Sequence, residues 1–229
     1  MQTIFALGGG SPPDAGLNKY IAELAGKPSP KLCFVGTASG DVDSYFDRIA
    51  EEFGRFDCAA KHLNLFRHPT ADLRGYVLES DIVYVGGGNT RSMLAVWREW
   101  GVDVVLREAW EQGILLCGPS AGGICWFEQG TTDSIPGVLT PLDALGFLPG
   151  SFCPHYDSEP LRRPGYHRLI GDHTLKPGYA ADDLVGLLFQ GTELADIVSA
   201  RPEAKAYRVE MVKGQVLETP LEPTVRLET

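Results

Sequence analysis

The sequence predicts an α/β fold: a mostly parallel sheet sandwiched by helices, with an antiparallel extension of strands toward the C-terminal end. Short, continuously apolar runs alternate with helix-compatible stretches along the first half of the 229 residues. Because these runs do not alternate in polarity, their strands should be covered on both faces, as parallel strands usually are. We expect residues 1–229 to form a single domain.

Each element follows from the local pattern. Five strands are expected in the first half, at Thr3–Leu7, Lys31–Val35, Ala60–Leu65, Ile82–Val85 and Ile114–Cys117. Shorter strands separated by glycine turns are expected later, at Gly186–Phe189, Asp196–Ser199, Tyr207–Val212 and Gln215–Glu218. The stretch Glu128–Pro154 is rich in Gly, Pro, Thr and Asp and is expected to be a long functional loop. The tail after about residue 218 is expected to be loosely ordered.

Composition and charge narrow the class of protein. A hydrophobic fraction of 44% suffices for a substantial core. With 30 acidic and 20 basic residues the formal charge is −10, which disfavours nucleic acid and anionic membranes as partners. Five cysteines without a C-x-x-C pair indicate reduced, mostly buried thiols. The first residues lack a basic, apolar leader, so we expect a cytoplasmic protein.

Glycine-rich turns follow three of the expected strands. These turns are Gly8–Gly10 after the first strand, Gly86–Thr90 after the fourth and Gly118–Gly122 after the fifth. In open α/β sheets, binding and catalytic sites lie at the carboxyl ends of the strands. The rim that these three turns share is therefore the candidate site.

The turn after the fifth strand has the sequence Gly-Pro-Ser-Ala-Gly, a G-x-S-x-G pattern centred on Ser120. In a nucleophile elbow, this spacing holds the serine on a sharp strand-to-helix turn and raises its Oγ above the sheet. A serine that merely caps a helix is the alternative for so short a pattern.

The Gly86–Thr90 turn follows the strand Ile82–Val85. Its N–H groups suit half of an oxyanion hole, and Asn89 suits a hydrogen bond to a polar group of a substrate. A structural turn with an N-cap at Thr90 is equally compatible with these residues. A phosphate-binding loop is disfavoured, because no Lys-Ser/Thr follows the glycines.

A serine nucleophile requires a base. Of the five histidines, His155 lies in Cys153–Asp157, where proline and aromatic neighbours would fix its ring at the sheet rim. His62, His68, His167 and His173 are expected to be structural or solvent-facing. An acid must hold the imidazole in turn, and Asp182 or Asp183 is the candidate, although only one of two adjacent residues can face His155 in an extended chain.

These motifs together resemble the peptidase E (aspartyl dipeptidase) family of serine peptidases, which includes cyanophycinases and has a fold similar to class I glutamine amidotransferases. The resemblance rests on G-G-G-N-T at Gly86–Thr90, G-P-S-A-G-G at Gly118–Gly123, P-H-Y at Pro154–Tyr156 and the acidic pair before a late strand. It extends from the first strand to about Phe189.

The resemblance implies Ser120 as nucleophile, His155 as general base and acid, and the N–H groups of Gly88 and Ala121 as the oxyanion hole. The position where the family usually has glutamate holds Asp183 here, with Asp182 as its competitor. Asp133 matches an acidic position near the site and is given a supporting role. The implied reaction is acyl transfer without a metal or an organic cofactor. Cys117 and Cys125 lie away from the elbow position, which disfavours glutaminase chemistry through a thiolate.

The implied substrate is a short peptide, foremost a dipeptide with an N-terminal aspartate. A cation should receive the acidic side chain, and Arg162, Arg163 and Arg168 follow His155 closely, with Arg168 as first choice. A cyanophycinase-like or isoaspartyl-peptide hydrolase is one alternative, and a non-catalytic small-molecule binding protein of the same fold is another. The resemblance is also compatible with a homodimer.

Overall fold

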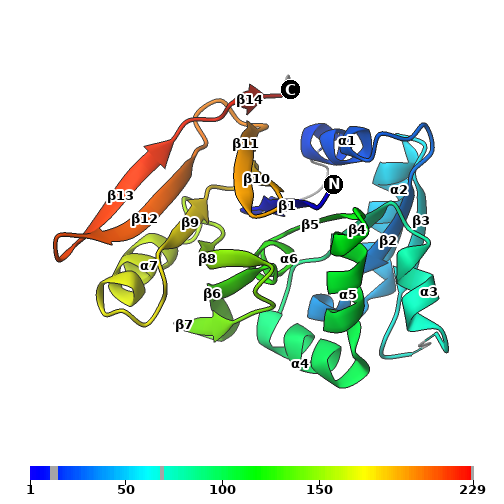
Figure 1. The fold of residues 1–229 in the computed structure, drawn as a ribbon, viewed down its shortest axis with the longest axis horizontal. Helices are drawn as coiled ribbons and strands as arrows, with labels where there is room; N and C mark the ends of the chain where they lie inside the picture. The colour runs from blue at the N-terminus through cyan, green and yellow to red at the C-terminus, as the bar shows by residue number, and fades with distance from the viewer. Residues whose placement is uncertain (11–14, 68–69, 228–229) are drawn as a thin grey trace.

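The computed structural model describes residues 1–10, 15–67 and 70–227, which form an α/β fold with two mixed sheets (Figure 1). The larger sheet has the strand order β14-β11-β10-β1-β5-β4-β2-β3. Its strands are β1 (Thr3–Leu7), β2 (Lys31–Val35), β3 (Ala59–Leu63), β4 (Ile82–Val85), β5 (Leu115–Pro119), β10 (Val185–Gln190), β11 (Glu193–Ser199) and β14 (Val225–Arg226).

The parallel half of this sheet confirms the strands expected from the apolar runs. Strands β1, β5, β4, β2 and β3 pair in parallel, and β1, β2 and β4 have the expected bounds. Strand β10 pairs with the other edge of β1 in the antiparallel direction. The first strand of the chain is therefore central, between a parallel and an antiparallel neighbour.

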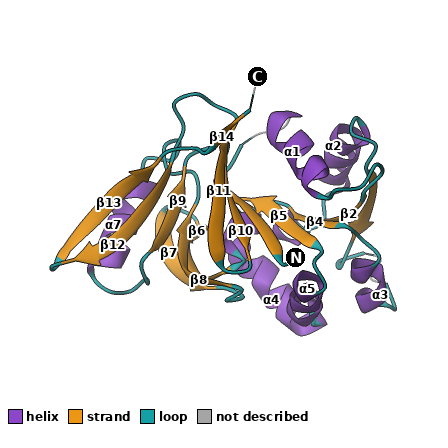
Figure 2. Ribbon diagram, turned by 45° about the horizontal axis from the view of Figure 1, so that its top comes forward, coloured by secondary structure: helices purple, strands orange, loops and turns teal. Residues whose placement is uncertain are grey.

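Helices cover both faces of the larger sheet (Figure 2). Helices α1 (Ala15–Leu24) and α2 (Asp43–Gly54) pack on one face, against Phe5 and Phe34. Helices α3 (Leu73–Leu78), α4 (Thr90–Trp100) and α5 (Val102–Glu111) pack on the other face, against Ile4 and Val35. Successive side chains of a strand point to opposite faces, which is why a continuous apolar run fits this position. In the part of the chain that the structure describes, no helix is long and apolar enough to span a membrane.

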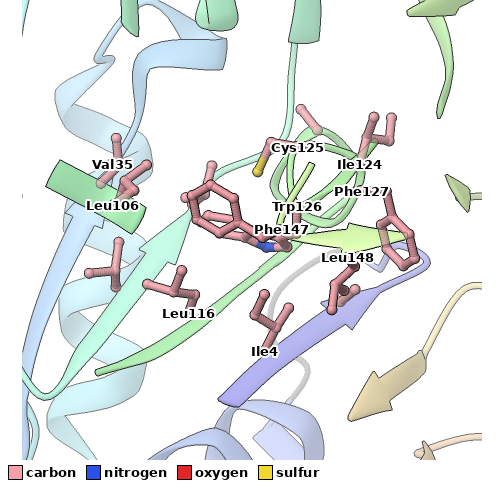
Figure 3. Close-up of a cluster of buried hydrophobic side chains, with 14 of the residues drawn as sticks. Ile4, Val35, Leu106, Leu116, Ile124, Cys125, Trp126, Phe127, Phe147 and Leu148 are labelled. Atoms are coloured by element: carbon pink, nitrogen blue, oxygen red, sulfur yellow. The ribbon is translucent and has the colours of Figure 1, made fainter. Parts of the chain in front are cut away.

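The core beneath the short helix α6 (Ala121–Ile124) joins the two sheets (Figure 3). Ile124 and Trp126 are fully buried, and the Trp126 ring lies 5.8 Å from the Phe147 ring. Strand β1 contributes Ile4 to the same cluster. The turn that carries Ser120 is thus held from below by large, immobile side chains.

A second, six-stranded sheet with the order β13-β12-β9-β8-β6-β7 lies beside the first. Its strands are β6 (Phe127–Ile135), β7 (Val138–Asp143), β8 (Leu148–Cys153), β9 (Gly178–Ala181), β12 (Ala206–Val212) and β13 (Gln215–Leu221). The expected long loop at Glu128–Pro154 is wrong, because β6, β7 and β8 occupy it. Gly130, Pro141, Pro149 and Gly150 lie within these strands, whose residues range from buried to exposed, so no unbroken apolar run marks them in the sequence.

The C-terminal strands do not form one antiparallel extension. β10 and β11 complete the first sheet, whereas β12 and β13 form a hairpin at the edge of the second, next to helix α7 (Arg162–Gly171). The expectation of a loosely ordered tail is also wrong for the described residues. β13 continues to Leu221, and β14 pairs in parallel with β11. The pairing of β10 with β1 brings the residues before β10 to the end of β1, where the candidate site lies.

Candidate active site

Ser120 lies on a sharp turn between β5 and α6. Its φ of 56° and ψ of −112° are an unusual conformation for a residue with a side chain. The side chain makes no capping hydrogen bond to α6, so the helix-cap alternative does not hold. A Cβ on Gly122 would stand 2.1 Å from the carbonyl oxygen of Val85, so only glycine allows β4 and the turn to approach so closely. Backbone strain of this kind is typical of nucleophile elbows.

Three successive carbonyl groups at the end of β1 anchor the three segments of the site. The hydrogen bonds join Ser120 N to Leu7 O (3.2 Å), His155 N to Gly8 O (3.0 Å) and Leu184 N to Gly9 O (2.9 Å). The serine, histidine and aspartate predicted from the sequence therefore come from segments docked on one short stretch of backbone.

The imidazole of His155 faces Asp183. Its Nδ1 lies 2.8 Å from Asp183 Oδ1, and both side chains are about four-fifths buried, with exposures of 21% and 24%. A Cβ on Gly9 would lie 2.4 Å from His155 Nδ1, so the ring rests directly on the glycine backbone. His155 itself has a positive φ of 53°. This geometry holds the ring with one nitrogen on a carboxylate.

The two adjacent aspartates have different partners. Asp182 Oδ2 accepts a hydrogen bond from Lys205 N at 2.9 Å, and burial raises the pKa of this carboxyl group. Burial also opposes ionisation of Asp183, but hydrogen bonds from His155 and Ser158 outweigh it and lower the pKa of Asp183. Asp183, ionised at neutral pH, is therefore the acid that meets His155.

The glycine turn after β4 is fixed by its neighbours. Asn89 N donates to Ala38 O at 2.8 Å, and Gly87 N donates to Tyr45 Oη at 3.2 Å. The Asn89 side chain accepts from Ser92 N at 2.9 Å and donates to Ser134 O at 3.1 Å. Asn89 thus caps α4, which begins at Thr90, and both ends of its side-chain amide have partners within the protein.

Asp133 lines a small cavity. It is 61% exposed and lies 3.2 Å from the guanidinium of Arg162, which is 2% exposed and also binds Glu159 Oε2 at 2.5 Å and Thr131 O at 3.2 Å. Glu159 N in turn donates to His155 O at 3.1 Å. The cavity of about 200 Å³ is lined by Asp133, Gly137, Val138, Leu139, Glu159, Pro160, Leu161 and Arg162.

The two arginines expected to bind an acidic substrate have different surroundings. Arg163 makes two hydrogen bonds to Glu218, at 3.0 and 2.8 Å, and its guanidinium stacks on Tyr156 and Tyr207. Arg168 is 63% exposed and faces Asp172, 3.8 Å away. Arg163 is thus committed to the C-terminal hairpin, whereas Arg168 lines a second cavity with Gly137, Val138 and Leu139. Binding of an acidic side chain by either arginine stays a prediction.

His62, His167 and the five cysteines have structural surroundings, whereas His173 is exposed. His62 stacks on Phe46, His167 Nε2 lies 2.8 Å from Glu218 Oε2, and His68 lies outside the described residues. His167, expected to face solvent, is instead hydrogen-bonded. All five cysteines are buried and free, and burial raises the pKa of Cys117 and Cys125 well above the ordinary value. Neither thiol is a nucleophile at neutral pH.

Sequence reasoning missed two residues beside the histidine and aspartate. Asp157 Oδ1 accepts from Asp183 N at 2.9 Å, and Asp157 Oδ2 pairs with the Arg201 guanidinium. The position of Asp157, two residues after His155, is the sequence signal that could have marked it. Nothing in the local sequence marks Arg201, whose position follows from the pairing of β10 with β11.

A serine on a strand-to-helix elbow, on a segment docked next to that of a largely buried histidine–aspartate pair, is compatible with a hydrolase that acts by acyl transfer. The comparison with known families agrees: residues 4–197 match the model of Peptidase family S51. The chain belongs to this family of peptidases, the peptidase E family.

Individual relatives carry related names. The chain is 50% identical over 225 residues to the "Uncharacterized peptidase YgaJ" of Bacillus subtilis, covering 96% of this chain and 97% of the relative. It is 35% identical over 136 residues to "Peptidase E" of Shewanella amazonensis, covering 58% of this chain and 55% of that one.

Two solved structures share the fold. A peptidase from an acI-B1 Actinobacterium superposes with a TM-score of 0.70 at 17% identity, covering 96% of this chain and 97% of that one. A putative peptidase E protein from Listeria monocytogenes gives a TM-score of 0.63 at 17% identity, covering 97% of this chain and all of the other. At this level of identity the likeness concerns the fold alone.

Proposed function

We propose that the protein is a serine peptidase that hydrolyses short peptides through an acyl-enzyme, with Ser120, His155 and Asp183 as its triad. One observation carries the proposal: the 2.8 Å contact between His155 and Asp183, on segments docked beside Ser120 on the carbonyl groups that end β1. The matched peptidase family supports the same reaction class.

The chemistry follows from the orientation of His155. Because Asp183 accepts a hydrogen bond from Nδ1–H, Nε2 of the neutral ring carries the lone pair. Nε2 takes the proton of Ser120 Oγ as that oxygen bonds to the peptide carbonyl carbon. The protonated ring then gives this proton to the leaving amine as the C–N bond breaks. Water repeats the cycle on the ester and releases the acid and free serine.

The oxyanion requires N–H donors close to Ser120. The amides of Gly87 and Asn89 are already committed, to Tyr45 Oη and Ala38 O, which supports the intervening Gly88 N–H as one donor. Ala121 N–H, in the first turn of α6 directly after Ser120, is the second. Loss of one such donor typically costs about 100- to 1000-fold in kcat.

The cavity beside Asp133, which is linked to the triad through the hydrogen bond from Glu159 N to His155 O, is proposed as a subsite for the free amino group of a small substrate. Its volume of about 200 Å³ is below the roughly 300–1,000 Å³ of sites for drug-sized ligands. Two carboxylates, Asp133 and Glu159, share the single buried guanidinium of Arg162, so the rim keeps a net negative charge. Such a rim favours the ammonium of a peptide N-terminus. Preference for an N-terminal aspartate stays a prediction of the family resemblance.

A panel of dipeptides tests the proposal. Wild-type protein, Ser120→Ala and His155→Ala are assayed on Asp-X, Glu-X and neutral dipeptides, on their N-acetylated forms and on longer aspartate-rich polymers. We expect hydrolysis of free dipeptides that both substitutions nearly abolish. Turnover of polymers in preference to dipeptides would favour the cyanophycinase-like alternative.

A serine-reactive fluorophosphonate probe addresses the alternative of a non-catalytic binding protein. We expect labelling of the wild-type protein that is lost in Ser120→Ala. An unlabelled wild-type protein that also hydrolyses no dipeptide would refute the peptidase proposal.

A further inference from the structure

We propose that Asp157 and Arg201 form a clamp that positions Asp183 against His155. The inference rests on the proposed function, in which Asp183 is the acid of the triad. Neither residue of the clamp contacts His155 through its side chain in the described contacts, so both are positioning residues.

The clamp consists of two linked contacts. The Arg201 guanidinium pairs with Asp157 Oδ2, and Asp157 Oδ1 accepts a hydrogen bond from the backbone N–H of Asp183 at 2.9 Å. Arg201 is itself anchored, because its N–H donates to Ser199 Oγ at 3.2 Å while Ser199 Oγ donates to Arg201 O at 2.7 Å. The end of β11 is thereby connected to the backbone of the aspartate.

The backbone at Asp183 needs such support. Val185 N donates to Asp182 O at 3.3 Å, which closes a turn around Asp183 and Leu184. Leu184 has a φ of 68°, a conformation that a residue with a side chain adopts only when its surroundings enforce it. Gly9 O holds the turn through Leu184 N, and Asp157 holds it through Asp183 N.

Exact placement matters more for aspartate than for glutamate. The side chain of Asp183 has one methylene fewer than that of a glutamate, so a displacement of its backbone is not absorbed by an additional side-chain torsion. The observed 2.8 Å contact with His155 thus depends on where the turn places the Asp183 Cα. A clamp on the N–H of the same residue acts directly on that position.

Charge provides a second reason for Arg201. The charged and titratable groups near Asp183 are His155, Asp157, Asp182 and Arg201, and Ser158 adds a hydrogen bond. Asp157 alone would place a second negative charge next to the triad acid. Pairing it with Arg201 neutralises that charge and adds a favourable interaction with Asp183.

The Arg201–Asp157 contact also connects the segment after β11 to the segment after His155. The test must therefore distinguish a contribution to stability from the positioning of Asp183. The test is a double-mutant cycle on the full chain. Its variants are Arg201→Gln, Arg201→Lys, Asp157→Asn, Asp183→Asn and the double variant Arg201→Gln/Asp183→Asn. The matched control is Arg55→Gln, which removes an exposed arginine that pairs with Glu51 on α2, remote in sequence from the triad.

In metal sites, mutation of a residue that orients a ligand lowers affinity or activity by roughly 10- to 100-fold. By analogy, we expect Arg201→Gln to lower the kcat for dipeptides by about tenfold. KM should change by less than about twofold, because the substrate is not contacted. Arg201→Lys should recover part of the loss and Arg55→Gln should show none. In the Asp183→Asn background, Arg201→Gln should have no further effect, because the carboxylate it positions is absent.

NMR spectroscopy provides a second measurement, because the Asp183→Asn variant could hydrolyse dipeptides too slowly for kinetics. The proton on His155 Nδ1, which bonds to Asp183, should give a downfield NMR resonance that Arg201→Gln shifts or broadens and Arg55→Gln leaves in place. An unchanged resonance together with unchanged kcat would overturn the clamp. The clamp would also be overturned if Arg201→Gln lowered kcat by the same factor in the Asp183→Asn variant as in the wild-type protein.

These outcomes are separate from failure of the proposed function. If wild-type protein hydrolyses no dipeptide and its Ser120 does not react with a fluorophosphonate, the peptidase proposal fails whatever Arg201 does. If wild-type protein is active and the cycle is additive, only the clamp fails.

Discussion

The backbone of Gly9 forms the floor on which the His155 ring rests. A Cβ at residue 9 would lie 2.4 Å from Nδ1 and Cε1 of His155 and 2.2 Å from Oδ1 of Asp183. Such separations do not occur between non-bonded heavy atoms. The histidine–aspartate contact therefore exists because the chain has no side chain at this position, which supports a direct test.

Gly9→Ala should remove activity without unfolding the protein. The added methyl group must displace either the ring or the carboxylate, so we expect a fall in dipeptide kcat of about 100-fold or more, by analogy with loss of general acid–base catalysis. Gly54→Ala is the matched control, because a Cβ there meets nothing within 4 Å at the end of α2. Steady-state kinetics and circular dichroism of both variants provide the measurement. Full activity of Gly9→Ala would contradict the assignment of His155.

The two adjacent aspartates should affect the pH dependence of stability in opposite directions. The pKa of Asp183 is lowered in the folded protein, so its stabilising contribution is present above the unfolded pKa of about 3.9 and is lost as the pH falls through the folded pKa. The pKa of Asp182 is raised, so ionisation of Asp182 destabilises the fold as the pH rises above that same unfolded value.

Urea unfolding between pH 3 and pH 7 checks this difference for Asp183→Asn and Asp182→Asn, each against wild type. The stability advantage of wild type over Asp183→Asn should shrink as the pH is lowered. Relative to Asp182→Asn, wild type should instead become less stable as the pH is raised. Two curves of the same slope would be inconsistent with the separate roles of these residues.

Glu218 should be a stability residue of the C-terminal hairpin. Its carboxylate accepts hydrogen bonds from Tyr156 Oη at 2.6 Å and from Arg163, and it contacts His167 Nε2 at 2.8 Å. Burial opposes its ionisation, but these partners, Arg163 first, lower the pKa of Glu218. Glu218→Gln leaves the cation without its charge partner, and we expect a loss of about 1–3 kcal/mol in the free energy of unfolding.

Glu210→Gln serves as the control for that measurement, since Glu210 is a partly exposed glutamate on the neighbouring strand β12. A change of no more than about 0.5 kcal/mol is expected there. If the two substitutions changed the free energy of unfolding in urea equally, the Glu218 contacts would make no specific contribution to stability.

Arg168→Ala should leave dipeptide hydrolysis within about twofold of wild type. The side chain is mostly exposed, and its ion pair with Asp172 is long, so its removal affects neither the site nor the fold appreciably. Kinetics on Asp-X and neutral dipeptides measure this directly. A selective loss on Asp-X would restore the role expected from the sequence and would require α7 to present the arginine differently from the structure described here.

Sequence patterns predicted the parallel half of the fold because its strands are buried on both faces. Thr3–Leu7, Lys31–Val35 and Ile82–Val85 are short, mostly apolar runs, and their length of four or five residues favours strands over buried helices. Strands β6 to β8 were not predicted, because their Thr, Gly and Pro residues interrupt the apolar residues, although Thr131 and Thr132 are themselves buried. Their pairing is determined by neighbours distant in sequence, which propensity does not report.

The sequence likewise predicted some residues of the candidate site and not others. Ser120 and His155 lie in short motifs whose chemistry is specific, and the structure brings their segments to one strand end. Asn89, by contrast, has an amide that suits a substrate or a helix N-terminus equally well, and only the position of α4 decides between them. Arg163 and Arg168 depend on the rotation of a helix about its axis, which a single arginine in the sequence does not reveal.

The docking of three segments on Leu7, Gly8 and Gly9 also governs when the enzyme can first act during its synthesis. The N-terminal strand emerges from the ribosome early, but the partners of these carbonyl groups include Leu184, and the Arg201 that steadies Asp183 comes later still. A nascent chain of 180 residues therefore holds the serine and histidine without the acid. Catalysis by this triad therefore waits until β10 and β11 have been synthesised and β10 has paired with β1.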